Sequence, residues 1–240
     1  MNVLSIGNSF SQDAQAYLHG VCSSAGVDVY AVNLYIGGCP LVKHLNNIKG
    51  NLADYDLEIN GKFSGQKISI ADALNLAEWD VITLQEASAR AVEIAHFEPY
   101  ISEICRYIKE KCPNAKIALH QTWGYSDELI QTINDLGFKT PMDMFGAVEE
   151  NYKKIAKEIK ADMIIPSGNA IKYLLENGYS SHRDGQHASL GAGRYALALT
   201  WLKALFGISP IGNSFRGFAV EMTEDEILAA QRAADLAFRN

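Results

Sequence analysis

The sequence predicts an α/β fold with a mainly parallel sheet. Short apolar runs alternate with segments of helical spacing along the chain, which is the pattern of strands joined by crossover helices. Polar residues of unusual chemistry follow several of those runs, at the edge where a parallel sheet places its ligand site. The 240 residues are 48% hydrophobic and 20% charged, and no repeat, low-complexity stretch or linker divides them. We therefore predict one domain over residues 1–240.

Each predicted strand is a short run rich in apolar or β-branched residues that stops at a glycine, a proline or a polar residue. These runs span residues 3–6, 27–36, 81–84, 116–119 and 163–165. The stretch 40–72 is less regular. Within it, residues 57–59 and 67–70 around Asn60-Gly61 are expected to form a small hairpin, because Asn-Gly favours tight turns.

Helices are predicted where apolar residues recur every three or four positions. These segments are residues 13–25, 99–111, 143–160, 189–206 and the end of the chain from 223. Ser189 is expected to cap the fourth of these helices. Thr223 is expected to open the last one, with Glu226 three residues later completing a capping box.

The net charge of −7 argues against non-specific nucleic-acid binding, which depends on basic patches that meet phosphates. The hydrophobic runs are too short to span a membrane, and the first residues do not resemble a signal peptide. Four cysteines without a C-x-x-C pair disfavour a thiolate zinc site and a disulfide scaffold. We expect a cytoplasmic protein without nucleic-acid or membrane partners, although a secreted protein that had lost its leader would show the same features.

Ser9 is the candidate nucleophile, because it follows the first predicted strand and begins the turn into a helix. A serine there can present its hydroxyl near free backbone amides. His187 is the candidate base, and Asp184 three residues earlier can orient its imidazole. Both have plainer interpretations, with Ser9 as a helix N-cap and His187 as a capping or core histidine.

Other polar residues compete for a place in the same site. His182 is an alternative base, and His120 follows a predicted strand and could line the cleft. A metal site built from His182, Asp184 and His187 is a further alternative, but no additional ligand is evident. Trp123, near the same strand end as His120, suits sugar stacking or, alternatively, plain core packing.

Three motifs, in this order, resemble those of the SGNH (GDSL-like) hydrolases. Residues 7–10 (GNSF) resemble the GDS-type first block, Gly38 matches the second-block glycine, and residues 184–187 (DGQH) match the D-x-x-H fifth block. More narrowly, the stretches GNSFSQDA, YIGGCPL and DGQHAS resemble a bacterial branch of that superfamily. The resemblance covers residues 3–206 and implies a flavodoxin-like three-layer α/β/α sandwich with a five-stranded parallel sheet in the order 2-1-3-4-5.

Two departures from the family pattern bear on the site. Asn8 stands where aspartate is usual, and its side chain can make similar turn hydrogen bonds. The third block, G-x-N-D, is replaced by residues 84–88 (LQEAS). Family members that act on acetylated sugars often carry Q-G-E there. The resemblance therefore implies Gln85 as a side-chain oxyanion donor, beside the backbone amides of Ser9 and Gly38.

The function that the resemblance implies is a serine esterase or deacylase for short acyl esters, with O-acetyl groups on carbohydrates as the expected substrate. Ser9, His187 and Asp184 would form its triad, and no cofactor or metal is required. The partner would be a small-molecule or carbohydrate ester, with His120 and Trp123 as substrate-binding residues.

Two rival functions remain open. The first is a non-catalytic carbohydrate- or ligand-binding module on the same fold, which an intact triad argues against. The second is a nucleotide-binding protein with GNSFS as its phosphate loop. The absence of G-x-G-x-x-G and of G-x-x-x-x-G-K-[ST] argues against this second function.

Overall fold

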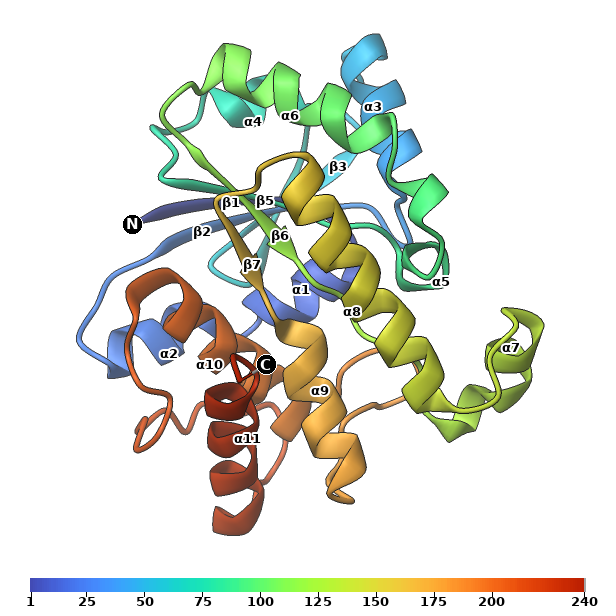
Figure 1. Ribbon diagram of the computed structural model, residues 1–240. Coiled ribbons are helices and arrows are strands. Elements are labelled where there is room, and N and C mark those ends of the chain that lie inside the picture. The colour runs from blue at the N-terminus through green and yellow to red at the C-terminus, as the bar shows by residue number, and fades with distance from the viewer. Residues whose placement is uncertain (240) are drawn as a thin grey trace.

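The computed structural model describes residues 1–239, and their strands form one seven-stranded sheet with the order β4-β3-β2-β1-β5-β6-β7 (Figure 1). The last residue of the predicted domain, Asn240, lies outside the described residues. The strands are β1 (Asn2–Gly7), β2 (Tyr30–Tyr35), β3 (Tyr55–Ile59), β4 (Lys62–Ile68), β5 (Val81–Leu84), β6 (Lys116–His120) and β7 (Met163–Ile165).

The parallel part of the sheet runs β2-β1-β5-β6-β7, which is the implied order 2-1-3-4-5. The expected total of five strands is wrong, because β3 and β4 extend the sheet beyond β2 as an antiparallel hairpin. Asn60 and Gly61 turn this hairpin with φ values of 50° and 75°, the left-handed conformation that a two-residue turn needs. The strand expected at 67–70 runs from Lys62 to Ile68 instead, because Ser69 already caps the following helix.

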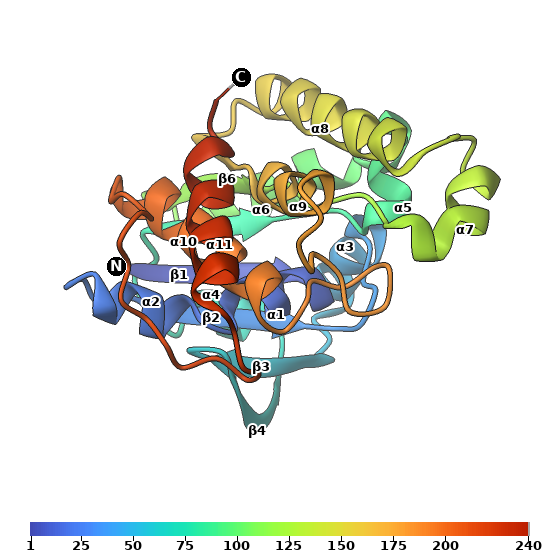
Figure 2. The same cartoon turned by 90° about the horizontal axis from the view of Figure 1, so that it is seen from below.

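Helices cover both faces of the sheet (Figures 1 and 2). One face carries α1 (Ser9–Gln15), α2 (Leu18–Ser24), α9 (Ser167–Glu176), α10 (Ala192–Phe206) and α11 (Glu224–Leu236). The other carries α3 (Leu41–Gly50), α4 (Ile70–Leu74), α6 (Tyr100–Lys111) and most of α8 (Pro141–Glu158). The loops after β5 and β6 contain α5 (Ser88–Ala91), α7 (Ile130–Asp135) and the 3-10 turns Ile94–His96 and Asp127–Leu129.

The core lies in two apolar layers, one on each side of the sheet. Successive side chains of a strand point to opposite faces, so Val3 packs into one layer and Leu4 into the other. This is a mixed α/β architecture with one central sheet flanked by helices, as the sequence predicts. No helix within residues 1–239 is long and apolar enough to cross a membrane.

Of three helix starts predicted from the sequence, two are wrong and one is confirmed. The helix predicted at 13–25 is two helices, and α1 begins at Ser9 because the Asn8 side chain caps it. Ser189 is not the N-cap of α10, which begins at Ala192; its hydroxyl accepts a hydrogen bond from an amide one turn further on, at 2.8 Å. The capping box of Thr223 and Glu226 is confirmed.

Candidate active site

Ser9 is the first residue of α1, directly beyond the carboxyl end of β1. The Asn8 side chain holds this turn, because its Oδ1 accepts a hydrogen bond from the Phe10 amide at 3.0 Å. The Ser9 amide lies in the first turn of a helix, where backbone N–H groups have no partner within the helix. The side chain and backbone of Ser9 thus both belong to the edge of the sheet where a ligand would bind.

The structure brings Ser9, His187 and Asp184 together in one hydrogen-bonded row. The Ser9 hydroxyl lies 2.9 Å from His187 Nε2, and His187 Nδ1 lies 2.7 Å from Asp184 Oδ2. A carboxylate can only accept, so Nδ1 carries the proton and Nε2 is free to accept one from the serine. This is the geometry of a nucleophile, a base and a group that orients the base.

Asp184 remains ionised in this arrangement. Burial raises the pKa of its carboxyl, but hydrogen bonds from the His187 amide, the His187 ring and the Gln186 amide outweigh that effect and lower the pKa to about 2. The two amide bonds to Oδ1, at 3.0 Å from Gln186 and 2.7 Å from His187, also fix the carboxylate to its own loop. Asp184 therefore offers a stable negative charge to the imidazole.

His182, the alternative base, bonds groups other than the Ser9 hydroxyl. Its Nε2 lies 3.1 Å from the Gly124 carbonyl, which can only accept, so Nε2 carries the proton. Its Nδ1 is then the acceptor for the Ser181 hydroxyl at 2.8 Å. Burial lowers the pKa of His182 to about 4, so the ring is neutral near pH 7. Both ring nitrogens are therefore occupied, one by Ser181 of the same loop and the other by Gly124 of the segment after β6.

His120 does not line an open cleft. Its side chain is fully buried, and burial lowers its pKa to about 3. Its Nδ1 lies 2.6 Å from Gln85 Oε1, and Gln85 Nε2 donates to Asn8 Oδ1 at 2.6 Å. Because the Phe10 amide requires an oxygen at this position of Asn8, the whole row from Asn8 to His120 has one consistent orientation. His120 thus supports the N-cap of α1 through Gln85. The expectation that it contacts substrate is corrected, because its side chain is buried.

Gln85 lies beside Asn8, the residue before Ser9. It is 1% exposed, and its two polar atoms bond Asn8 and His120. Nε2 carries two hydrogens, of which the bond to Asn8 uses one.

Trp123 is also fully buried, which corrects its expected role as a substrate-stacking surface. Its ring packs against Phe10, with the ring centroids 4.2 Å apart. Its Nε1 donates to the Gln186 carbonyl at 2.8 Å, inside the segment between Asp184 and His187. Trp123 therefore joins the helix that carries the serine to the loop that carries the base.

Gly38 lies in the loop after β2 with φ of 60°, a conformation that favours glycine. The next residue is tied to the helix cap, because Asn8 Nδ2 donates to the Cys39 carbonyl at 3.1 Å. The buried carboxylate of Glu86 accepts from the Leu41 amide at 3.3 Å, at the start of α3. Within residues 1–239 the Gly38 amide donates to no other backbone group. The loop is thus held on both sides while this amide stays free.

One cluster that contacts the site was not predicted from the sequence. It consists of Asp13, Arg183 and Arg194. Asp13 is a fully buried acid that accepts hydrogen bonds from both arginines. Two signals were available, since Asp13 follows the candidate nucleophile by one helical turn and Arg183 directly precedes Asp184.

The structure does not assemble the alternative metal site. Within the described part of the chain, no group of three or more His, Cys, Asp or Glu side chains is placed to hold a metal ion.

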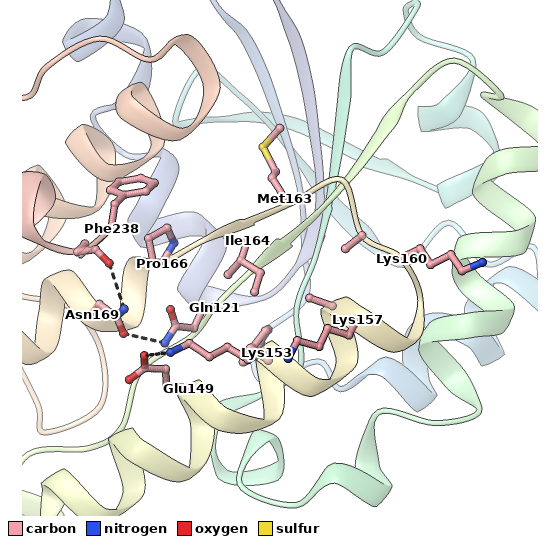
Figure 3. Close-up of a pocket in the computed structure, with 14 residues that line it drawn as sticks. Gln121, Glu149, Lys153, Lys157, Lys160, Met163, Ile164, Pro166, Asn169 and Phe238 are labelled. Carbon is pink, nitrogen blue, oxygen red and sulfur yellow. Dashed lines mark hydrogen bonds and ion pairs between the residues drawn. The ribbon is translucent and has the colours of Figure 1, made fainter. Parts of the chain in front are cut away.

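A groove of about 840 Å³ opens away from these residues, along the free edge of β7 between α8 and the end of α11 (Figure 3). Lys153 and Lys157 of α8 and Lys160 in the turn after it line the groove, and none of the three triad candidates lines it. A short edge strand with lysines beside it is a common protection against pairing with other chains. Because no triad candidate lines the groove, it is separate from the candidate active site.

Comparison with known proteins gives one family match. The model described as "Domain of unknown function (DUF4886)" matches residues 2–237. A comparison with curated proteins finds no match.

Solved structures extend this result to the fold. A DUF4886 family protein from Bacteroides uniformis is 32% identical, with a TM-score of 0.89 over 99% of this chain and 94% of that chain. A proposed SGNH hydrolase from Slackia heliotrinireducens is 21% identical, with a TM-score of 0.56 over 85% and 98% of the two chains. An acetylxylan esterase from Geobacillus stearothermophilus is 16% identical, with a TM-score of 0.53 over 85% and 94%. The chain belongs to the DUF4886 family and has the fold of the SGNH hydrolases.

Proposed function

We propose that this protein is a serine esterase in which Ser9 is the nucleophile, His187 the general base and Asp184 the residue that orients the base. The observation that carries the proposal is the unbroken row of hydrogen bonds from Ser9 Oγ to His187 and on to Asp184, at 2.9 Å and 2.7 Å. Both distances lie within the range that proton transfer requires.

The reaction follows from that row. Ser9 Oγ attacks the ester carbonyl while His187 Nε2 takes its proton, and the imidazolium that forms is stabilised by the Asp184 carboxylate. The tetrahedral intermediate collapses as His187 protonates the leaving alcohol, which leaves an acyl group on Ser9. Water, activated by the same imidazole, then releases the acid and restores the serine.

Three donors are proposed for the oxyanion: the amides of Ser9 and Gly38 and the second Nε2 hydrogen of Gln85. The free Gly38 amide and the helix-terminal Ser9 amide support this assignment. For Gln85 the support is its bond to Asn8, the residue before the nucleophile, at 2.6 Å.

The proposed substrate is a short acyl ester, with an O-acetyl group on a sugar or a similar polar alcohol as the leading candidate. The Gln85-Glu86 pair resembles the third block of enzymes that act on acetylated sugars. The fold is shared with an acetylxylan esterase from Geobacillus stearothermophilus. Aromatic stacking by Trp123 no longer supports this choice, because that ring is buried.

The test is reaction with a fluorophosphonate probe together with hydrolysis of p-nitrophenyl acetate. Wild-type protein should be labelled on the peptide that contains Ser9, and Ser9→Ala should lose both labelling and hydrolysis, by a factor on the order of 10⁴ or more. Ser64→Ala, on the exposed strand β4, is the matched control and should behave like wild type. A Ser9→Ala variant that keeps more than about a tenth of the activity would show that another group is the nucleophile. Absence of labelling in wild type would favour the non-catalytic binding module.

A further inference from the structure

Asp13 is a buried carboxylate on the helix of the nucleophile that no step of the proposed reaction uses. Its side chain is 0% exposed, and it lies on α1 four residues after Ser9. Residues four apart on a helix share one face, a single turn away from each other. Asp13 therefore lies on the same side of α1 as the nucleophile.

Three donor groups surround this carboxylate. Arg183 Nη1 lies 2.9 Å from both carboxylate oxygens. Arg194 contacts Oδ1 through Nε and Nη2, each at 2.8 Å. The Ala188 amide donates to Oδ2 at 3.1 Å. A charge this deeply buried is tolerated only when it is paired and hydrogen-bonded, so the cluster forms as a unit.

The loop that carries the base is a small hairpin over residues 181–189. His182 and Ala188 form an isolated antiparallel bridge. The Arg183 amide donates to the His187 carbonyl at 3.0 Å. Backbone hydrogen bonds thus close the open end of the hairpin, and Asp184 and His187 lie toward its tip.

Asp13 contacts this hairpin on both sides of the catalytic segment. Arg183 directly precedes Asp184, and Ala188 directly follows His187. Arg183 Nη1 also donates to the Ala188 carbonyl, which joins the two sides. One carboxylate thereby connects the helix of the nucleophile to both ends of the segment that holds the base.

We propose that Asp13 is a positioning residue that, through Arg183 and Arg194, sets the distance between His187 Nε2 and Ser9 Oγ. This inference rests on the proposed esterase function. Proton transfer needs the 2.9 Å contact to persist, and a misplacement of about 1 Å can lower a rate by roughly 10²-fold. Hydrogen bonds are directional, so those from Arg183 and the Ala188 amide fix the hairpin against α1 more narrowly than apolar packing would. Arg194 ties the same carboxylate to the first turn of α10, and its backbone amide donates to the Ser189 carbonyl at the end of the hairpin at 2.9 Å.

The test compares Asp13→Asn with Glu58→Gln. Glu58 is also a buried carboxylate under α1, bonded to Gln12 and, at 2.8 Å, to Asn33, and it has no contact with the hairpin 181–189 among its hydrogen bonds. Both variants are expected to lose stability. Only Asp13→Asn should lower kcat, by roughly 10- to 100-fold with KM changed by less than about threefold, and it should slow fluorophosphonate labelling to the same extent.

A second variant covers the case in which Asp13→Asn does not fold. Arg194→Lys keeps the positive charge but removes the Nε and Nη2 pair that contacts Asp13. It should lower kcat in the same direction and speed hydrogen exchange at the Ala188 amide. Both measurements are made at a temperature well below the melting temperature of the variant, and kcat is corrected for the folded fraction.

The outcomes separate the two proposals. If wild type is labelled and Ser9→Ala is not, but Asp13→Asn and Arg194→Lys match Glu58→Gln in kcat, then the positioning role is overturned and the esterase stands. If wild type is labelled no more than Ser9→Ala, both proposals fall. A loss of kcat at nearly constant KM in the Asp13 cluster alone supports the inference.

Discussion

His187 Nε2 lies 2.9 Å from Ser9 Oγ, although 178 positions separate the two residues along the chain. The nucleophile comes from the end of β1, and the base comes from a hairpin between α9 and α10. The two meet because parallel strands end at one edge of the sheet and the hairpin is held against α1 at that edge.

Replacing Asp184 should damage catalysis far more than binding. Asp184→Asn removes the charge that stabilises the imidazolium, so kcat should fall on the order of 10⁴-fold with KM nearly unchanged. Asp127→Asn, an exposed carboxylate in the 3-10 turn after β6, is the control and should retain wild-type kinetics. Steady-state kinetics on p-nitrophenyl acetate measure both. A loss below about tenfold would remove Asp184 from the triad.

Gln85→Ala should lower kcat more than it raises KM, because an oxyanion donor acts mainly on the transition state. The expected loss is roughly 10²-fold, the usual result of removing one such donor. Gln85 also bonds His120 and Asn8, so the melting temperature should fall as well. His120→Asn disturbs the same row without removing the donor, and a matching loss of kcat in that variant would show that Gln85 acts through structure alone.

The acyl chain preference should favour short esters. Acetate should exceed octanoate in kcat/KM by at least about tenfold, which corresponds to about 1.4 kcal/mol in transition-state binding. A series of p-nitrophenyl esters from acetate to octanoate measures this directly. Preference for octanoate would contradict the carbohydrate-acetyl substrate while leaving the serine mechanism in place.

Acid should destabilise the fold before the carboxylates titrate. Burial lowers the pKa of His44 and His120 to about 3 and that of His182 to about 4, from an ordinary 6.5. The unfolded chain binds protons at these three sites below about pH 6.5 and the folded chain does not, so the free energy of unfolding falls as the pH drops toward 4. Each histidine contributes up to about 1.4 kcal/mol per pH unit in this window.

Glu86 opposes this trend, because burial raises the pKa of its carboxyl. Urea unfolding between pH 7.5 and 5 measures the net slope, and His120→Asn should reduce that slope by about one proton. A slope that His120→Asn leaves unchanged would show that the His120 ring takes up its proton in the folded state as well.

Local sequence patterns predicted the parts of the fold that depend on short-range rules. The strands at 81–84 and 163–165 have the predicted bounds, because a short apolar run that stops at a polar residue or proline leaves little freedom. The helices α3 and α9 were not predicted. The seven-strand sheet also differs from the implied five, because the number of strands depends on where the hairpin β3–β4 pairs.

The sequence by itself determined which residues were chemically suited to the site: a serine after the first strand and a D-x-x-H segment near a late helix. Only the tertiary structure decided which of them meet. His187 and His182 lie in one loop and look alike in sequence, yet one faces Ser9 and the other bonds the Gly124 carbonyl. The reason is physical. Periodicity and capping act over a few residues, whereas burial and contact between side chains depend on how distant segments pack. Asp13 shows this most clearly, because its role depends on partners 170 and 181 positions away.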